Sequence, residues 1–319
     1  MFLRSLASPY CKILRLVRRP TAQKLDGEAM RSLPVGQATR GRPLVISRLA
    51  AGLILSSSIG LLAYWRRSLS RSGVAGAIIA GSTTFGLGGT TWGFSLIYFF
   101  VSSTLLSHFR AREKAETAAD KFSKGSRRDF AQVMANGGVA SALATSHALV
   151  STSQARQTLH AGYIGALATA NADTWATEVG VLSPHTPRLI TNGQPTVPGT
   201  SGGVTLLGTG ASAAGALSLG LFNWLLRPRD RLARHLPLIS LISGLAGSLC
   251  DSLLGATVQA MYYCPTCQKE TERLVHSCGT STRFLRGHRH INNDVVNFLA
   301  TLCGTIVAIL VERSMRNRA

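Results

Sequence analysis

Charged residues are scarce in this 319-residue sequence, at 15% of the total. A soluble globular domain carries about a quarter, and with a mean hydropathy of +0.19 the deficit argues against an ordinary water-soluble protein. Acids are rarest, because 14 Asp and Glu stand against 34 Lys and Arg. The basic residues lie mostly between apolar segments and in the first 48 residues. We therefore interpret them as flanks of membrane helices and expect no nucleic-acid partner.

Two further absences concern export and disulfide bonds. Residues 1–44 are rich in Arg and interrupted by prolines, but they contain no long apolar core followed by a small-residue cleavage site, as a secretory signal would. A basic cytoplasmic arm, an organelle transit peptide and an unused upstream start remain as interpretations, and we expect the segment to be poorly ordered. Three of the six cysteines are scattered and three are clustered, a pattern that does not indicate a disulfide framework or an oxidising compartment.

The sequence does contain a series of apolar runs joined by short polar segments. They are Val45–Trp65, Gly73–Leu87, Trp92–His108, Phe130–Val150, Leu159–Leu182, Val204–Leu226, Leu236–Tyr263 and Asp294–Val311. Most approach the ~20 residues that cross ~30 Å of hydrocarbon, although the second is short. We predict an all-α fold, a polytopic transmembrane bundle of about seven or eight helices over residues 45–319. Residues 264–293 form a soluble cysteine-bearing loop in this prediction, and the membrane is a bacterial plasma membrane or an organelle membrane.

The acids inside the apolar runs are the main functional signal. Asp173, Glu178 and Asp251 lie within runs, and Asp294 stands at the mouth of the last one. A charged group at mid-bilayer costs about 2.5–3.5 kcal/mol and needs a partner. The same runs contain no Lys or Arg to form a buried ion pair with the three internal acids, which favours a metal or proton site. Hard oxygen ligands of this kind suit Mg²⁺ together with substrate phosphate.

Other polar residues accompany these acids. Asp173 and Thr177 share a helix face, whereas Glu178 lies about 140° round from Asp173. The turn from Pro198 to Gly203 leads into the sixth run, and glycines at a helix start favour binding of phosphate. With eight crossings the clusters all fall on one side of the membrane, which predicts a single polar site. Its further candidate residues are Arg127, Arg128, Asn136, Asn171, Thr174, Arg188, Gly199, Thr200, Ser201, Gly202, Gly203, Ser252, Asn293 and Asn297.

The cysteine loop has the composition of a metal site. Cys264 and Cys267 form a C-x-x-C pair, and His276 and Cys278 follow about ten residues later. Tetrahedral zinc needs four nitrogen or sulfur ligands, and these residues supply four. The spacing predicts a structural zinc ion, because four protein ligands leave no open position. A metal-free reduced loop or a redox pair is the alternative interpretation.

Several long motifs resemble a known membrane family. They read RRDFAQVMANGG, GALATANADTWATEVGVLS, PRLIT, PGTSGGVTLLGT, GSLCDSLLGATVQ and NNDVVNF, and they occupy roughly residues 70–312. In this order they resemble the integral-membrane group known as domain of unknown function 92. That group includes animal transmembrane protein 19 and the plant and cyanobacterial phytyl-phosphate kinase, and it is distantly similar to dolichol kinase and CDP-diacylglycerol synthase.

The resemblance implies a transferase, a Mg²⁺-dependent isoprenoid-phosphate kinase. Such an enzyme moves a phosphoryl group from a nucleoside triphosphate, with CTP favoured, to an isoprenoid (phytyl or prenyl) monophosphate. The catalytic residues would be Asp173, Glu178, Asp251 and Asn136, and the three acids would hold Mg²⁺. Residues 199–203 would bind phosphate together with Arg127, Arg128 and Arg188, and the lipid tail would lie between helices.

Two other classes of function stay open. In an ion-coupled transporter, intramembrane acids relay ions or protons, but such a protein is expected to contain inverted repeats. We find no convincing internal repeat in this sequence. In a structural or interaction protein with a zinc knuckle, the acids of the fifth and seventh runs would have no role.

Overall fold

The computed structural model describes residues 41–118, 127–227 and 231–318. Residues from Pro43 to Ala319 form one compact unit. The other unit, Met1–Arg42, lies almost wholly outside the described residues, and so does nearly all of the basic arm predicted for residues 1–44.

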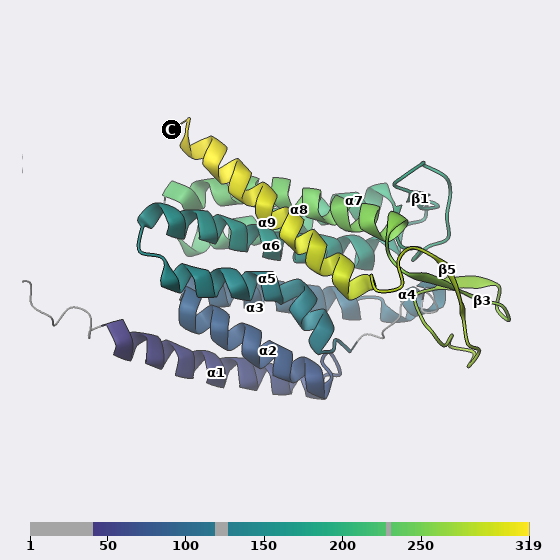
Figure 1. Cartoon of the computed structure of the whole chain (residues 1–319), viewed down its shortest axis with the longest axis horizontal. Helices are drawn as coiled ribbons and strands as arrows, with labels where there is room; N and C mark the ends of the chain where they lie inside the picture. Colours follow the sequence, from purple (N-terminus) through teal and green to yellow (C-terminus); the bar gives the residue numbers. More distant parts are fainter. Residues whose placement is uncertain (1–40, 119–126, 228–230, 319) are drawn as a thin grey trace, which may run out of the picture. The chain divides into compact units, whose positions relative to one another are not determined.

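Helices dominate the described part of the chain (Figure 1). They are α1 (Gly41–Trp65), α2 (Arg71–Thr83), the π-helical turn η4 (Thr84–Gly88), α3 (Thr90–His108), α4 (Ala111–Ala118), α5 (Phe130–Leu149), α6 (Ser153–Gly180), α7 (Leu206–Leu226), α8 (Arg231–Thr257) and α9 (Asn293–Arg316). Each of the eight predicted apolar runs corresponds to one helix, and α2 with η4 makes up the short second run. The seventh run was predicted too long, because α8 ends at Thr257 and a strand begins at Met261.

Four of the described helices are long and apolar enough to cross a membrane by length and composition. They are α1 over Val45–Trp65, α7 over Leu206–Leu226, α8 over Leu232–Thr257 and α9 over Asn293–Arg316. The remaining predicted runs are helical without meeting this criterion. For α2 the reason is its length of 13 residues. Helix α6 has 28 residues and is long enough, but its sequence is not apolar enough.

Helix α6 is the centre of the bundle. Every residue from His160 to Ala172 is buried, and α6 contacts α3, α5, α7, α8 and α9. Figure 1 shows α6 next to α5 and crossed by α9. Small residues permit this close packing: a Cβ atom added at Gly304 of α9 or at Gly247 of α8 would collide with Thr169 of α6. Small residues at helix contacts are the usual means of close approach in membrane bundles.

Two small sheets lie in the connections that the structure describes. In the first, β1 (Arg188–Leu189) pairs antiparallel with β2 (Gly203–Val204). The second has the order β4-β3-β5, formed by Lys269–Thr271, Met261–Cys264 and Arg283–Arg286. The predicted soluble cysteine loop is therefore a three-stranded antiparallel unit inserted between α8 and α9.

Capping residues determine where the helices near the polar site begin. Asp129 accepts a hydrogen bond from the Gln132 N–H, and the Gln132 side chain accepts one from the Asp129 N–H, which makes a capping box at the start of α5. Thr205 caps α7 and Asn292 caps α9 through side-chain oxygens. The residue before the cap of α5, Arg128, forms an isolated parallel β-bridge with Leu69 in the connection between α1 and α2.

Candidate functional site

A cavity of about 260 Å³ opens where several helix ends meet. Its wall comes from the last turns of α6, the first turns of α5, α7 and α9, the C-terminal half of α8 and the turn that precedes α7. The sequence-predicted residues on this wall are Arg128, Asn136, Asp173, Thr174, Thr177, Glu178, Gly199, Thr200, Ser201, Gly202, Gly203, Asp251, Ser252, Asn293 and Asn297. Residues far apart in the sequence are thus neighbours around one space.

Two carboxylates from different helices contribute to the wall. Asp173 extends from α6 and Asp251 from α8, and both are half-buried. The Asp251 Oδ2 atom is buried and has no hydrogen-bond partner, and the same is true of Ser212 Oγ on α7, which also lines the cavity. A buried carboxylate oxygen without a donor is costly unless a cation or another donor approaches it. These hard oxygen atoms fit the ligand preference of Mg²⁺.

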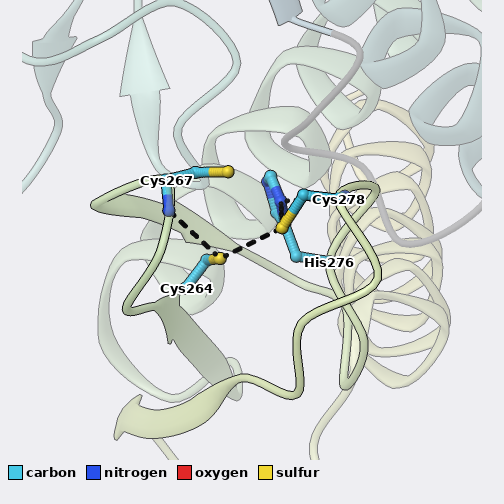
Figure 2. Close-up of side chains that lie close together, drawn as sticks. All are labelled: Cys264, Cys267, His276 and Cys278. Carbon is cyan, nitrogen blue, oxygen red and sulfur yellow. Dashed lines mark hydrogen bonds between the residues drawn. The ribbon is translucent and has the colours of Figure 1, made fainter.

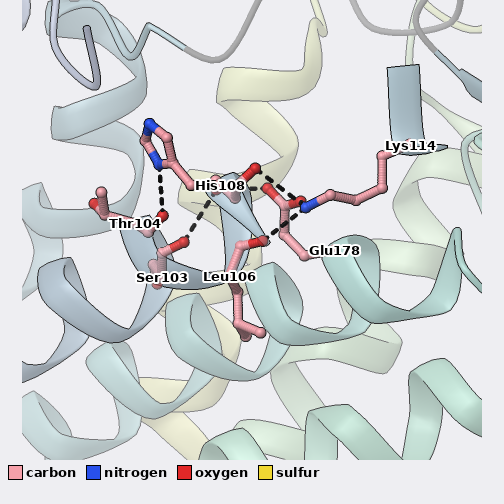
Figure 3. A network of polar contacts seen from close by, with 7 residues as sticks. Ser103, Thr104, Leu106, His108, Lys114 and Glu178 are labelled. Atoms are coloured by element: carbon pink, nitrogen blue, oxygen red, sulfur yellow. Dashed lines mark hydrogen bonds and ion pairs between the residues drawn. The ribbon is translucent and has the colours of Figure 1, made fainter. Parts of the chain in front are cut away.

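The third acid, Glu178, already has partners. Its Oε1 accepts a hydrogen bond from Ser107 Oγ of α3, and its Oε2 pairs with Lys114 Nζ of α4. Figure 3 shows Lys114 reaching Glu178 beside the end of α3, where it also donates to the Leu106 carbonyl at 2.6 Å. Both side chains of the pair are largely buried: Lys114 is 10% exposed and Glu178 is 23% exposed. The charge of Glu178 is therefore compensated inside the protein.

The glycine-rich turn contributes backbone groups to the wall. Gly199 and Gly202 have positive φ angles of 78° and 82°, a conformation that favours glycine. The N–H groups of Thr200 and Gly203 donate within the turn, to Val197 and Thr200 carbonyls, so they are not free phosphate donors. The start of α7 follows directly and lines the cavity with Thr205, Gly208 and Thr209. A helix N-terminus attracts anions, which makes this the wall best suited to phosphate.

One basic residue faces the cavity from the α5 side. Arg128 lines it just before α5 begins, next to Gln132 and Asn136. Burial lowers the pKa of the Arg128 guanidinium, and the negative charge of Glu178 opposes that shift. Asn136 Nδ2 donates to the Gln132 carbonyl at 3.1 Å. Arg128 therefore remains the candidate partner for an anion in the cavity.

Four sequence-predicted residues lie elsewhere. The Arg127 guanidinium stacks over the Tyr64 ring at 5.3 Å, and Arg188 is exposed and donates to the Gly193 carbonyl at 2.8 Å. Asn171 is fully buried, where it donates to the Gly215 carbonyl at 2.8 Å and accepts from Ser102 at 2.8 Å. Asp294 lies in the first turn of α9 and is not among the described residues that line the cavity.

The sequence interpretation also missed cavity residues. Gln132 could have been found from the sequence, because it stands three residues after Asp129 and this spacing predicts a capping box. Glu272, which comes from the cysteine loop, carried no such signal. Lys114 of the short polar helix α4 also carried no signal; it does not line the cavity but pairs with Glu178, which does. Glu272 Oε1 accepts a hydrogen bond at 2.8 Å from Gln259 Nε2, and Gln259 Oε1 accepts one at 2.8 Å from Ser201 Oγ of the glycine-rich turn.

The cysteine cluster lies beside this region, in the three-stranded unit. Cys264, Cys267, His276 and Cys278 each offer one ligand atom, and these atoms all lie within 4.8 Å of one another (Figure 2). Hydrogen bonds with Thr280 and His276 lower the pKa of the Cys278 thiol to about 6. The hydrogen bond with Cys278 raises the pKa of the Cys267 thiol to about 11. The four predicted zinc ligands are thus adjacent in space.

Comparison with known proteins assigns the chain to a family. Residues 54–305 match the integral membrane protein family DUF92. The chain belongs to this family. DUF92 membership agrees with the apolar helices above and makes the chain an integral membrane protein.

Individual relatives match this DUF92 chain over most of its length. Protein PGR of Arabidopsis thaliana is 34% identical over 274 residues, which cover 80% of this chain and 93% of the relative. An uncharacterized membrane protein of Methanocaldococcus jannaschii is 28% identical, with 83% and 94% covered. Protein VTE6, chloroplastic, of Arabidopsis thaliana is 27% identical, with 77% and 66% covered. No solved structure matches the chain.

Proposed function

We propose that the chain is a membrane lipid-phosphate kinase that transfers a phosphoryl group from a nucleoside triphosphate, with CTP favoured, to an isoprenoid monophosphate. The observation that carries the proposal is the cavity at the helix ends. There Asp173 and Asp251, from two helices of the bundle, share one space with the N-terminus of α7 and with Arg128. Carboxylates opposite phosphate-binding groups are the arrangement that phosphoryl transfer requires.

Asp173 and Asp251 are the residues that we expect to hold Mg²⁺. The orphaned Asp251 Oδ2 and its neighbour Ser212 Oγ are oxygen atoms of the kind this ion selects. Bound there, Mg²⁺ would supply positive charge to the phosphate oxygens. Because Glu178 is already paired with Lys114, its proposed role is to hold the end of α6 in place rather than to bind the metal.

The remaining wall residues have roles in positioning. In the transfer, an oxygen of the lipid phosphate attacks the terminal phosphorus of the nucleotide, the bond to the bridging oxygen breaks, and nucleoside diphosphate leaves. Arg128 would bind phosphate oxygens through two N–H groups, and the α7 N-terminus would add oriented N–H dipoles. Asn136, on the α5 side with Arg128, would orient the lipid phosphate. No covalent protein nucleophile is needed for this chemistry.

A second, apolar cavity supports a lipid as the acceptor. It has a volume of about 80 Å³ and lies among α1, α2, α3 and α5, with Ile59, Leu96 and Phe100 on its wall. It shares Arg128, Gln132 and Asn136 with the polar cavity. A substrate with a phosphate head and an isoprenoid tail would occupy both, with its head at Arg128 and the adjoining tail against the apolar wall.

The test is a direct assay of the purified protein in detergent. Radiolabelled CTP or ATP is supplied with Mg²⁺ and a panel of isoprenoid monophosphates that includes phytyl and shorter prenyl chains. We expect labelled lipid diphosphate that depends on the divalent cation. Labelled product from a phosphate without a lipid tail would contradict the role of the apolar cavity. Absence of any lipid diphosphate across the panel would contradict the kinase proposal and favour transport.

A further inference from the structure

The cysteine cluster has the dimensions of an occupied zinc site. Cys264 Sγ and Cys278 Sγ are 3.7 Å apart, and the edge of a tetrahedron with zinc–sulfur bonds of ~2.3 Å is ~3.8 Å. His276 Nδ1 lies 3.2 Å from Cys278 Sγ. The Cys267 N–H points at Cys264 Sγ at 3.5 Å, and Gln268 after it has a positive φ of 54°. The four side chains face a common centre in Figure 2.

A disulfide bond or ordinary packing fits the cluster less well than a metal ion. A disulfide needs a sulfur–sulfur distance of ~2.05 Å, well below the 3.7 Å between Cys264 and Cys278. Ordinary packing does not account for His276, a polar side chain that is only 3% exposed and directs its Nδ1 at Cys278 Sγ. Three sulfur atoms and one imidazole nitrogen form a donor set that selects zinc, and with four ligands it is a closed, structural set.

The same unit reaches the polar cavity through a chain of hydrogen bonds. Glu272, one residue beyond β4, lines the cavity and accepts from Gln259. Gln259 is fully buried and accepts in turn from Ser201 of the glycine-rich turn. On the other side, Arg286 of β5 donates to the Ala256 carbonyl at 2.8 Å and so caps the C-terminal end of α8. The unit therefore contacts both the turn and the helix that carries Asp251.

We propose that Cys264, Cys267, His276 and Cys278 bind one structural zinc ion, and that this ion holds Glu272 and Gln259 against the glycine-rich turn. The ion would link the two ends of the segment from Cys264 to Cys278. The strands of this three-stranded unit are only three or four residues long. Such short strands gain little stability from their own packing, and metal ligation is a common means of stabilising a unit of this size. The proposal does not depend on the identity of the reaction in the cavity.

Metal content tests the first part. The protein is purified in detergent without added metal and its zinc is measured by mass spectrometry, together with a variant that combines Cys264→Ser and Cys267→Ser. We expect about one zinc ion per unmutated chain and none in the double variant. Cys303→Ser is the matched control, because Cys303 is a free cysteine of α9 outside the cluster, and it should keep its zinc. Metal-free unmutated protein, or a Cys264–Cys278 disulfide in it, overturns the proposal.

Hydrogen exchange tests the second part without any activity assay. Removal of zinc with a chelator should speed amide exchange at least tenfold in the strands of the unit and in residues 198–203, while the central part of α6 stays protected. Gln259→Leu should keep its zinc but speed exchange in residues 198–203, because it cannot bond Ser201 or Glu272. Zinc removal that leaves exchange in residues 198–203 unchanged overturns the link to the cavity.

Discussion

Helix α6 contains two contrasting stretches, separated between Asn171 and Asp173. From His160 to Ala172 the helix is buried on every side, and its Thr and Asn side chains bond inside the bundle. Thr169 donates to the Gly165 carbonyl at 2.9 Å, and Asn171 has partners on α3 and α7. From Asp173 onward most residues of the helix line the cavity. Asn171 and Asp173 are nearly identical in size, so their surroundings decide their roles.

The contrast shows what distinguishes a structural polar residue from a functional candidate in this bundle. Both kinds are polar groups in an apolar helix, and both appeared in the sequence as members of one site. Asn171 has its hydrogen-bonding capacity taken up by neighbours, whereas the acid opposite Asp173, Asp251, keeps a buried oxygen without a donor. Unused hydrogen-bonding capacity facing a cavity is the better indicator of a ligand site.

The largest expected effect falls on the cavity side of this boundary. Asp173→Asn and Asp251→Asn should each lower kinase turnover by ~10²-fold or more, about 2.7 kcal/mol in the barrier, the scale of losing one electrostatic catalytic group. Their thermal stability in detergent should be unchanged or higher, because an amide preserves shape and removes a buried charge. The measurements are diphosphate formation and Tm. Full activity in both variants would refute the assignment of these two carboxylates.

The next effect concerns the closely packed stretch. A side chain at Gly304 would collide with Thr169 and approach the Gly165 carbonyl, 3.0 Å from the new Cβ. Gly304→Val should therefore destabilise the bundle by about 3 kcal/mol, the cost of overpacking a core. Gly210→Ala is the matched control, because a Cβ there meets nothing within 4 Å. Thermal unfolding in detergent separates the two, and equal Tm values would contradict the packing of α6 against α9.

A direct test of the boundary is Asn171→Leu, two residues before Asp173. The change removes the hydrogen bonds to Ser102 and the Gly215 carbonyl. We expect a loss of about 2 kcal/mol in stability, the cost of leaving buried polar groups unsatisfied. Activity per folded molecule should persist, unlike that of Asp173→Asn. If Asn171→Leu lowers turnover as much as Asp173→Asn while its stability stays normal, Asn171 has a role in the catalytic site and not only in packing.

The smallest effect is expected at the edge of the cavity. Lys114→Met removes the ion pair of Glu178 but keeps its hydrogen bond from Ser107. The change should cost about 1 kcal/mol of stability. Turnover should fall less than tenfold, since Glu178 holds the end of α6 rather than the metal. Combining Lys114→Met with Glu178→Gln should restore stability, because no unpaired charge remains. If the combined variant loses as much activity as Asp251→Asn, Glu178 does contribute to metal binding, as the sequence alone predicted.

The helices and the order of the polar clusters were predictable because they depend on local patterns. Apolar runs of near-spanning length mark each long helix, and the positions of Asp173 and Asp251 inside such runs are visible without any structure. The end of α8 was placed six residues too late, at Tyr263 instead of Thr257. The apolar stretch after Thr257 resembles a helix in composition, but Met261–Cys264 pairs with two strands that come later in the chain.

By itself, then, the sequence determined the membrane class, a bundle of about seven or eight apolar helices, the carboxylates within them and the four clustered zinc-ligand candidates. Only the tertiary structure decided which polar groups share a space: it brought Lys114 to Glu178 and Glu272 to the cavity wall, and it kept Arg127 and Arg188 away from that wall. The reason is physical. Hydrophobic periodicity and capping act over a few residues, whereas a contact between distant segments depends on how whole helices pack.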